Sequence, residues 1–73
     1  MKEVEQASCV VQIGESAGMV WKALADNGAM TMAQLVKNVG QPRDTVMQAL
    51  GWLAREDKIQ IEEDGRSRVI SLR

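Results

Sequence analysis

The segment from Gln41 to Lys58, QPRDTVMQALGWLAREDK, is the longest stretch of this 73-residue chain with a clear helical period and defined ends. Its apolar residues recur three and four positions apart and share one face of a helix: Val46, Ala49, Leu50 and Leu53. Pro42 suits the first turn of such a helix, because the N–H that proline lacks would have no partner there. We therefore predict a helix that ends near Asp57-Lys58 and packs this face against a core.

A shorter helix is predicted directly before it. Thr31 to Gln34 fits a capping box, in which the Thr31 side chain accepts a hydrogen bond from the backbone and the Gln34 side chain reaches back. This helix is expected to cover residues 32–39, and Gly40 ends it. Only Gly40-Gln41 then precedes the longer helix, and two helices joined by so short a turn form a helix-turn-helix.

A first helix is predicted from about Ile13 to Asn27, ended by Asn27-Gly28. Its apolar residues fall within an arc of roughly 100° and are expected to face the core, Trp21 included: Ile13, Ala17, Val20, Trp21 and Leu24. Residues 1–12 form an arm, for which a flexible tail, a short strand and an extension of the helix are all compatible with the sequence. We favour a tail that becomes ordered near Cys9, which divides the chain into an arm, 1–12, and a domain, 13–73.

The C-terminal segment is predicted to be a β-hairpin. Residues 59–62 alternate between apolar and polar, Asp64-Gly65 is a preferred two-residue turn, and residues 68–72 return. That turn predicts the facing pairs Glu63–Arg66, Ile61–Arg68 and Ile59–Ile70. One face of the hairpin is then apolar and must pack on the helices, because a lone hairpin is marginally stable: Ile59, Ile61, Ile70 and Leu72. Residues 29–31 are expected to be a very short extended segment that pairs with the hairpin edge.

Three helices followed by a two-stranded hairpin predict an α+β, mainly helical fold, the winged helix-turn-helix. The chain also resembles, over residues 13–72, a small prokaryotic family of stand-alone winged helix-turn-helix domains of unknown function. The resemblance is carried by the motifs Ile13-Gly14-Glu15, Val20-Trp21-Lys22-Ala23-Leu24, Asn27-Gly28 and Ala49 to Ile59. Winged-helix regulators commonly have Gly where this chain has Asp57, a residue type that tolerates the left-handed conformation better than most. The resemblance implies the fold and carries no settled activity.

Composition excludes several kinds of chemistry. The chain has no His and one Cys, so that zinc sites, haem ligation and Cys/His catalysis are not expected. No nucleophile–base pair and no Gly-rich phosphate loop are visible, and we expect neither an enzyme nor a cofactor. Cys9 is interpreted as an ordinary thiol, and no apolar run approaches the roughly 20 residues of a membrane span. With no hydrophobic segment at the N-terminus to act as a signal peptide, the expected location is the cytoplasm.

A DNA-binding face is the leading functional hypothesis. The start of a recognition helix reaches base edges in a helix-turn-helix, and the wing can reach phosphates or the minor groove. The candidate residues are Lys37, Gln41, Arg43, Thr45, Gln48, Arg66, Ser67 and Arg68. Against this hypothesis stand the net charge of −1, the acidic residues beside the wing and Asp44, since DNA affinity draws on several cations that meet phosphates.

A protein-interaction face is the alternative hypothesis. Trp52 lies outside the core arc and beside Gly51, and Arg55 follows on the same helix. Aromatic anchors of this kind are enriched in interface hot spots. Trp52 either covers its own hairpin or arm, or contacts a second subunit or another protein. The expected partners are therefore double-stranded DNA and a homodimer mate or other protein, with no role for a membrane.

Overall fold

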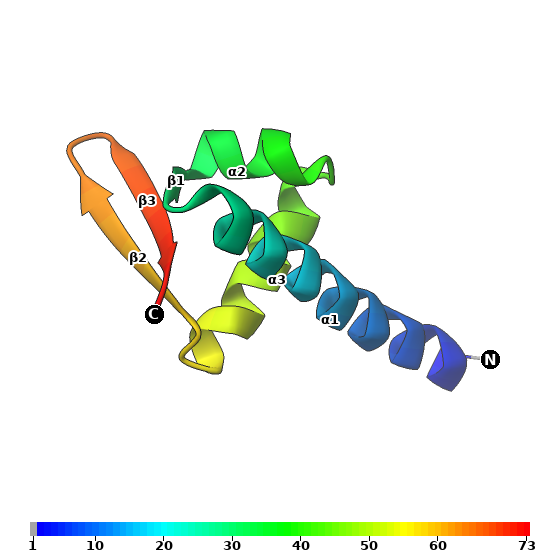
Figure 1. The fold of residues 1–73 in the computed structure, drawn as a ribbon. Helices are drawn as coiled ribbons and strands as arrows, with labels where there is room; N and C mark the ends of the chain where they lie inside the picture. Colours follow the sequence, from blue (N-terminus) through cyan, green and yellow to red (C-terminus); the bar gives the residue numbers. More distant parts are fainter. Residues whose placement is uncertain (1) are drawn as a thin grey trace.

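The computed structural model describes the backbone of residues 2–73 and the side chains of residues 9–63 and 65–73. Three helices and three short strands follow one another along the chain: α1 (Lys2–Asn27), β1 (Met30–Thr31), α2 (Met32–Val39), α3 (Arg43–Arg55), β2 (Ile59–Asp64) and β3 (Ser67–Leu72). The strands form one antiparallel sheet in the order β1-β3-β2, which lies at one side of the three helices (Figure 1). The predicted winged helix-turn-helix is confirmed, and so is the pairing of residues 30–31 with the hairpin edge.

The first helix is much longer than predicted. It begins at Lys2, not near Ile13, so that the arm is an extension of the helix and the favoured tail was wrong. Residues 2–13 contain no Pro and no Gly, and Glu, Gln, Lys and Ala among them are good helix formers, which leaves nothing to stop the helix. The N-terminal half of α1 projects beyond the rest of the molecule (Figure 1). The division into an arm, 1–12, and a domain, 13–73, stays a prediction.

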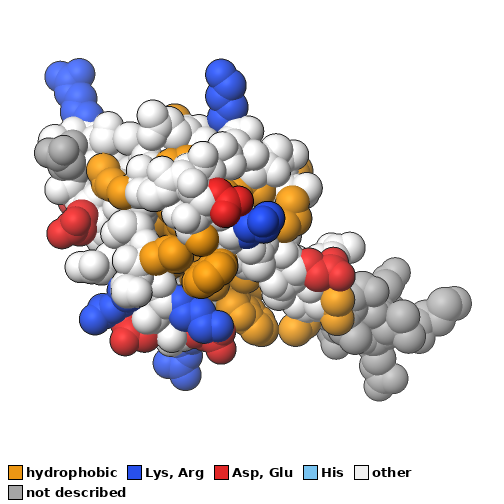
Figure 2. Space-filling view, viewed as in Figure 1, with side chains coloured by type: hydrophobic (Ala, Val, Ile, Leu, Met, Phe, Trp, Pro, Cys, Tyr) orange, Lys and Arg blue, Asp and Glu red, His pale blue; other side chains and the backbone are white. Residues whose placement is uncertain are grey.

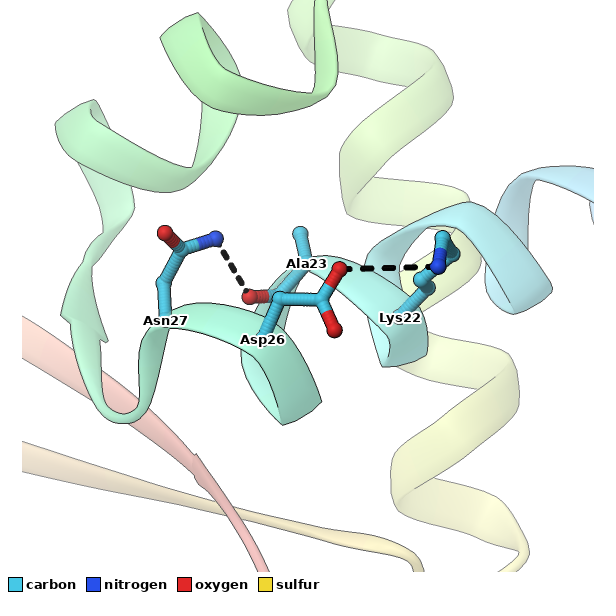
Figure 3. A network of polar contacts seen from close by, with 4 residues as sticks. All are labelled: Lys22, Ala23, Asp26 and Asn27. Atoms are coloured by element: carbon cyan, nitrogen blue, oxygen red, sulfur yellow. Dashed lines mark hydrogen bonds and ion pairs between the residues drawn. The ribbon is translucent and has the colours of Figure 1, made fainter.

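The other end of α1 is closed by Asn27 and Gly28, as predicted. The Asn27 side chain donates from Nδ2 to the Ala23 carbonyl at 2.8 Å (Figure 3). Gly28 adopts a φ of 80°. One turn earlier, Lys22 Nζ lies 3.5 Å from Asp26 Oδ2 on the solvent side of the helix. The chain can therefore leave α1 and enter β1 within two residues.

The helix-turn-helix has the predicted capping box. Thr31 Oγ1 accepts from the Gln34 N–H at 3.2 Å, and Gln34 Oε1 accepts from the Thr31 N–H at 3.0 Å. Gly40 ends α2 with a φ of 75°. Pro42 caps α3 from outside the helix instead of lying in its first turn, with an extended ψ of 148°, and its carbonyl accepts from the Val46 N–H. The difference is one residue, because the residue before a helix has non-helical torsions.

The core lies where the helices and the sheet meet. The predicted inner face of α3 is fully buried, and α1, α2 and the sheet pack around it. Its buried hydrophobic residues are Ala17, Val20, Ala23, Leu24, Met30, Met32, Leu35, Val46, Ala49, Leu50, Leu53, Ile59 and Ile70.

The hairpin register differs from the prediction by two residues. Asp64 pairs with Ser67, Ile61 with Ile70 and Ile59 with Leu72, so that the turn is Gly65-Arg66 and not Asp64-Gly65. Gly65 has a φ of 65° and Arg66 a negative φ, the pattern of a turn that needs Gly at its first central position. A shift of two preserves the side-chain faces, so the predicted apolar face survives. Ile59 and Ile70 are buried on it, and Ile61 near the wing tip is exposed.

The end of α3 explains how Asp57 replaces glycine. Asp57 adopts a φ of 62°, the left-handed conformation that Gly adopts most readily and that Asp tolerates better than most residues. Its N–H donates to the Ala54 carbonyl, and the Lys58 N–H donates to the Leu53 carbonyl, the two bonds of a Schellman motif. Arg73 Nη1 lies 3.1 Å from Asp57 Oδ1 and ties this turn to the end of the hairpin.

Candidate nucleic-acid interface

Four of the predicted DNA-binding residues surround one open depression of about 400 Å³, here called the basic depression. They come from the start of α3 and from the wing, and the start of α2 forms the remaining wall. The depression is lined by Thr31, Met32, Ala33, Arg43, Arg66, Ser67 and Arg68. Residues far apart in the sequence thus share one concave surface.

The fold fixes how these walls are arranged. Arg43 is the first residue of α3, which follows the C-terminal end of α2 after the short turn at Gly40, and it lines the same depression as Thr31, Met32 and Ala33 at the start of α2. β1 leads directly into α2 and pairs with β3, with Thr31 opposite Val69. This pairing brings β3, at the base of the wing, against the N-terminus of α2. Arg66 lies in the wing turn, and Ser67 and Arg68 are the first two residues of β3.

The electrostatics of the basic depression favour an anion. Arg68 Nε lies 3.7 Å from Glu63 Oε2, while Arg43 and Arg66 form no ion pair with the side chains that the structure describes. The N-terminus of α2 adds backbone N–H groups and the positive end of a helix dipole. The α2 residues were missed at the sequence level, although the capping box at Thr31 already marks where that helix starts.

The remaining DNA-binding candidates lie elsewhere on the surface. Lys37 borders a separate surface hollow beside Asn27 and Ala29. Gln41 and Thr45 line a third hollow with Glu15 of α1. Gln48 is exposed on α3 and lines none of these hollows.

Asp44 has a local role at the start of α3. Its Oδ1 accepts from the Thr45 N–H at 2.9 Å, and the carboxylate sits in the first turn, where the helix dipole favours a negative charge. Because Pro42 offers no side-chain cap, Asp44 supplies an acceptor that the helix start otherwise lacks.

A second surface lies between α1 and the C-terminal half of α3. Trp21 and Trp52, the only aromatic residues of the chain, both line it and are 45% and 40% exposed. The predicted packing of Trp21 in the core was therefore wrong. This tryptophan groove has a volume of about 240 Å³ and is lined by Gly14, Ala17, Gly18, Trp21, Trp52, Leu53, Glu56 and Lys58. Figure 2 shows hydrophobic side chains gathered between the projecting helix and the end of α3.

The glycines beside Trp52 come from a different helix than the sequence suggested. Gly51 and Arg55 are exposed on α3 and do not line the tryptophan groove. Gly14 and Gly18 of α1 do, one helical turn apart. Their pairing with Trp52 depends on how α1 crosses α3, which no pattern within α3 reveals.

Other chemistry has little support among the residues that the structure describes. No cluster of three or more His, Cys, Asp or Glu side chains in that part of the chain could hold a metal ion. No helix there is both long and apolar enough to cross a membrane.

Similar structures share this arrangement of helices and wing. The solution structure of protein BT2368 from Bacteroides thetaiotaomicron superposes with a TM-score of 0.77 at 33% sequence identity, over 84% of this chain and 74% of that protein. BpsR from Bordetella bronchiseptica, whose structure is described as a mechanism for regulation of its DNA binding by 6-hydroxynicotinic acid, superposes with a TM-score of 0.76. Its sequence identity is 16%, over 99% of this chain and 66% of BpsR, so this likeness concerns the fold alone.

Sequence comparison identifies a relative and a family. The uncharacterised protein MJ1608 of Methanocaldococcus jannaschii is 38% identical over 65 residues, which cover 85% of this chain and 91% of that protein. Residues 4–72 match the winged helix-turn-helix domain family DUF2582, which confirms the resemblance seen in the sequence motifs. The chain belongs to this winged helix-turn-helix family, DUF2582.

Proposed function

We propose that this protein is a DNA-binding, transcription-regulating module that contacts duplex DNA through the basic depression. The observation that carries the proposal is the convergence of Arg43, Arg66 and Arg68 on one concave surface, together with the N-terminus of α2. Arginine side chains and helix N-termini are common phosphate ligands in protein–DNA complexes. The start of α3 and the wing are also the two parts through which this fold would approach a groove and its flanking phosphates.

The roles of the individual residues follow from their positions. Arg43 stands at the start of α3 and is suited to a guanine edge or a nearby phosphate, whereas Arg66 and Arg68 on the wing suit phosphates or the minor groove. Gln48 is exposed on α3 and suits an adenine edge. Ser67 in the depression, and Lys37, Gln41 and Thr45 outside it, are secondary candidates for backbone contacts.

The charge of the chain sets the expected strength of binding. With a net charge of −1 and Glu63 beside Arg68, the protein lacks a strong general attraction to DNA. Binding should therefore depend on the few arginines of the depression and weaken steeply with salt. BpsR, a structural neighbour described as DNA-binding, supports the proposal at the level of the fold.

The test is a titration of a fluorescent mixed-sequence duplex, measured by anisotropy at low and at moderate salt. We expect binding at low salt that the double variant Arg43→Ala/Arg66→Ala largely removes. Lys22→Ala is the control, because Lys22 is a cation on α1 that lies outside the basic depression and forms only an exposed ion pair. Absence of binding even at low salt, or equal binding by the double variant, would rule the proposal out.

A second candidate function is protein–protein interaction without DNA contact, as a homodimer or with another protein. The specific observation in its favour is the exposure of Trp21 and Trp52 in one groove. In the titration above, this candidate predicts no DNA binding at any salt concentration, combined with self-association or partner binding that depends on Trp52.

A further inference from the structure

We propose that the tryptophan groove and the projecting half of α1 together form the interface of a symmetric dimer, in which α1 packs antiparallel against α1 of a second copy. This interface lies on a different surface from the basic depression and does not depend on DNA binding. Several hydrophobic side chains are exposed on one side of α1. Val10 and Val11 are 53% and 57% exposed, and Trp21 is 45% exposed.

These residues form one continuous stripe on the helix. At 100° per residue, the positions from Val10 to Ala25 that fall within an arc of roughly 100° are all uncharged. They are Val10, Val11, Gly14, Gly18, Trp21 and Ala25. The stripe lies between the buried face of α1 and the charged side that carries Glu15, Lys22 and Asp26, and it meets the charged side where Val11 borders Lys22. A helix face that has no charged residue and carries an exposed tryptophan is unusual for a solvated surface and is typical of a contact with another protein chain.

The two glycines allow a close approach of a second helix. Neither has a positive φ, and a Cβ built on Gly14 or Gly18 would meet nothing within 4 Å inside the chain. The fold itself therefore does not need glycine at either position, although glycine in a helix interior costs stability relative to other residues. Close packing of a partner's backbone against this face explains why both positions are glycine.

The positions of the exposed residues select a second copy of the chain as the partner. The midpoint between Gly14 and Gly18 is position 16, and the midpoint between Val11 and Trp21 is the same position. A two-fold axis that passes this exposed face at the level of position 16 therefore places glycine level with glycine and, at the same time, Val11 of each copy level with Trp21 of the other. Such an isologous contact uses the same patch on both copies, which is the commonest arrangement of dimers.

The same register accounts for the length of α1. Its N-terminal half projects from the body, and a helical segment gains most of its stability from packing. In the proposed dimer, Val10 and Val11 of the projecting half lie against Trp21 and Trp52 of the second copy. Glu56 and Lys58, paired at 3.4 Å, form a polar rim at the far side of the groove. Each copy thus contributes its two valines to one end of the contact and its two tryptophans to the other end.

The first experiment is sedimentation equilibrium over a wide concentration range. Wild type is expected to dissociate from dimer to monomer on dilution, and Gly14→Gln/Gly18→Gln to stay a monomer throughout. Met19→Gln is the matched control, because Met19 is equally exposed, at 43%, but lies on the opposite side of α1. Dilution of wild type should also shift the tryptophan emission to longer wavelength, since both tryptophans lie in the contact.

A loss of folding must be separated from a loss of the contact. The melting temperature of the glycine variant, compared at a dilution where wild type is monomeric, is expected to equal or exceed that of wild type, because glutamine is the better helix former. A wild type that is monomeric at every concentration overturns the proposal. So does a dimer that resists the glycine variant, or one that Met19→Gln dissociates.

The register is tested by a double-mutant cycle. Val11→Ala and Trp21→Ala should each weaken the dimer, Trp21→Ala on the order of thirtyfold, the scale of an interface hot spot. The double variant should lose much less than the product of the two effects, because the residues contact each other across copies. Independent, multiplicative effects would contradict the antiparallel register.

Discussion

The basic depression and the tryptophan groove lie along the same helix and differ in almost every property. The depression, near the N-terminal end of α3, is lined by three arginines and the start of α2, whereas the groove, near the C-terminal end, is lined mainly by glycine, alanine, leucine and tryptophan. The two surfaces share no lining residue. A substitution in the lining of one surface therefore leaves the lining of the other unchanged.

The difference also shows how α3 is used. Its inner face is buried along its whole length, with Val46 near one end and Leu53 near the other. Arg43 lies on one flank of this face and Trp52 on the opposite flank, roughly 180° away around the helix. Packing of the buried inner face of α3 thus fixes the orientation of both surfaces. Both surfaces depend on this one buried face as a common support, although the side chains that line them differ in chemistry.

The largest expected effect comes from breaking that common support. Leu50→Ala removes a buried side chain from the middle of α3 and should lower the free energy of unfolding by about 3 kcal/mol, measured by urea denaturation. Because the stability of a small domain is only on the order of 5 kcal/mol, binding at both surfaces should weaken together. Met47→Ala, at an exposed position on the same helix, is the control and should change stability by less than about 1 kcal/mol. Loss of binding at only one surface would contradict the shared support.

Salt concentration should have very different effects on DNA binding and on self-association. If three arginines each neutralise one phosphate, raising salt from about 50 mM to about 200 mM should weaken DNA binding roughly fortyfold, and Arg66→Ala should reduce the slope of log affinity against log salt by about 0.9. Self-association through the tryptophan groove buries apolar surface and should be unchanged or slightly stronger under the same conditions. Anisotropy and sedimentation in matched buffers measure the two responses. Equal salt sensitivity of both would remove the distinction.

The capping box gives a prediction that should affect one surface only. Thr31→Ala removes the acceptor for the Gln34 N–H and should cost about 1 kcal/mol of stability, read from thermal unfolding. Thr31 also lines the basic depression, so DNA affinity should fall while self-association stays the same. Thr31→Ser keeps the hydroxyl oxygen and should behave nearly as wild type. A serine variant as weak as the alanine variant would show that the cap is not the cause.

The smallest expected effect concerns the turn after α3. Asp57→Gly should raise the free energy of unfolding by about 0.5 kcal/mol, because the left-handed conformation strains an aspartate and the lost ion pair with Arg73 is exposed. Asp57→Ala should lower it, since alanine has the strain without the ion pair. Urea denaturation measures both, and binding at either surface should not change. A glycine variant less stable than wild type would mean that the ion pair outweighs the strain.

The sequence alone was sufficient to establish most of the local structure. Period, caps and turns predicted α2, α3 and the helix end at Gly28, because each depends on residues within a few positions of one another. The pairing of residues 30–31 with the hairpin edge was predicted from the order of the elements, since its partners lie about 40 positions away. The apolar face of the hairpin was also predicted correctly although the turn was not. A two-residue shift leaves the alternation of side chains intact, and only the choice between Asp64-Gly65 and Gly65-Arg66 was open to error.

Only the tertiary structure decided which residues come together at the surface. The wing arginines line one depression with the start of α2 because β1 pairs with β3, and Arg43 at the start of α3 completes its lining. Trp21 and Trp52 line one groove because α1 crosses the C-terminal part of α3. The exposure of Trp21 was likewise beyond a helical wheel, since a residue at the edge of an apolar stripe is buried or exposed according to what packs beside it. Local patterns record how a segment folds, whereas a surface built from several segments depends on the angles and registers at which they pack.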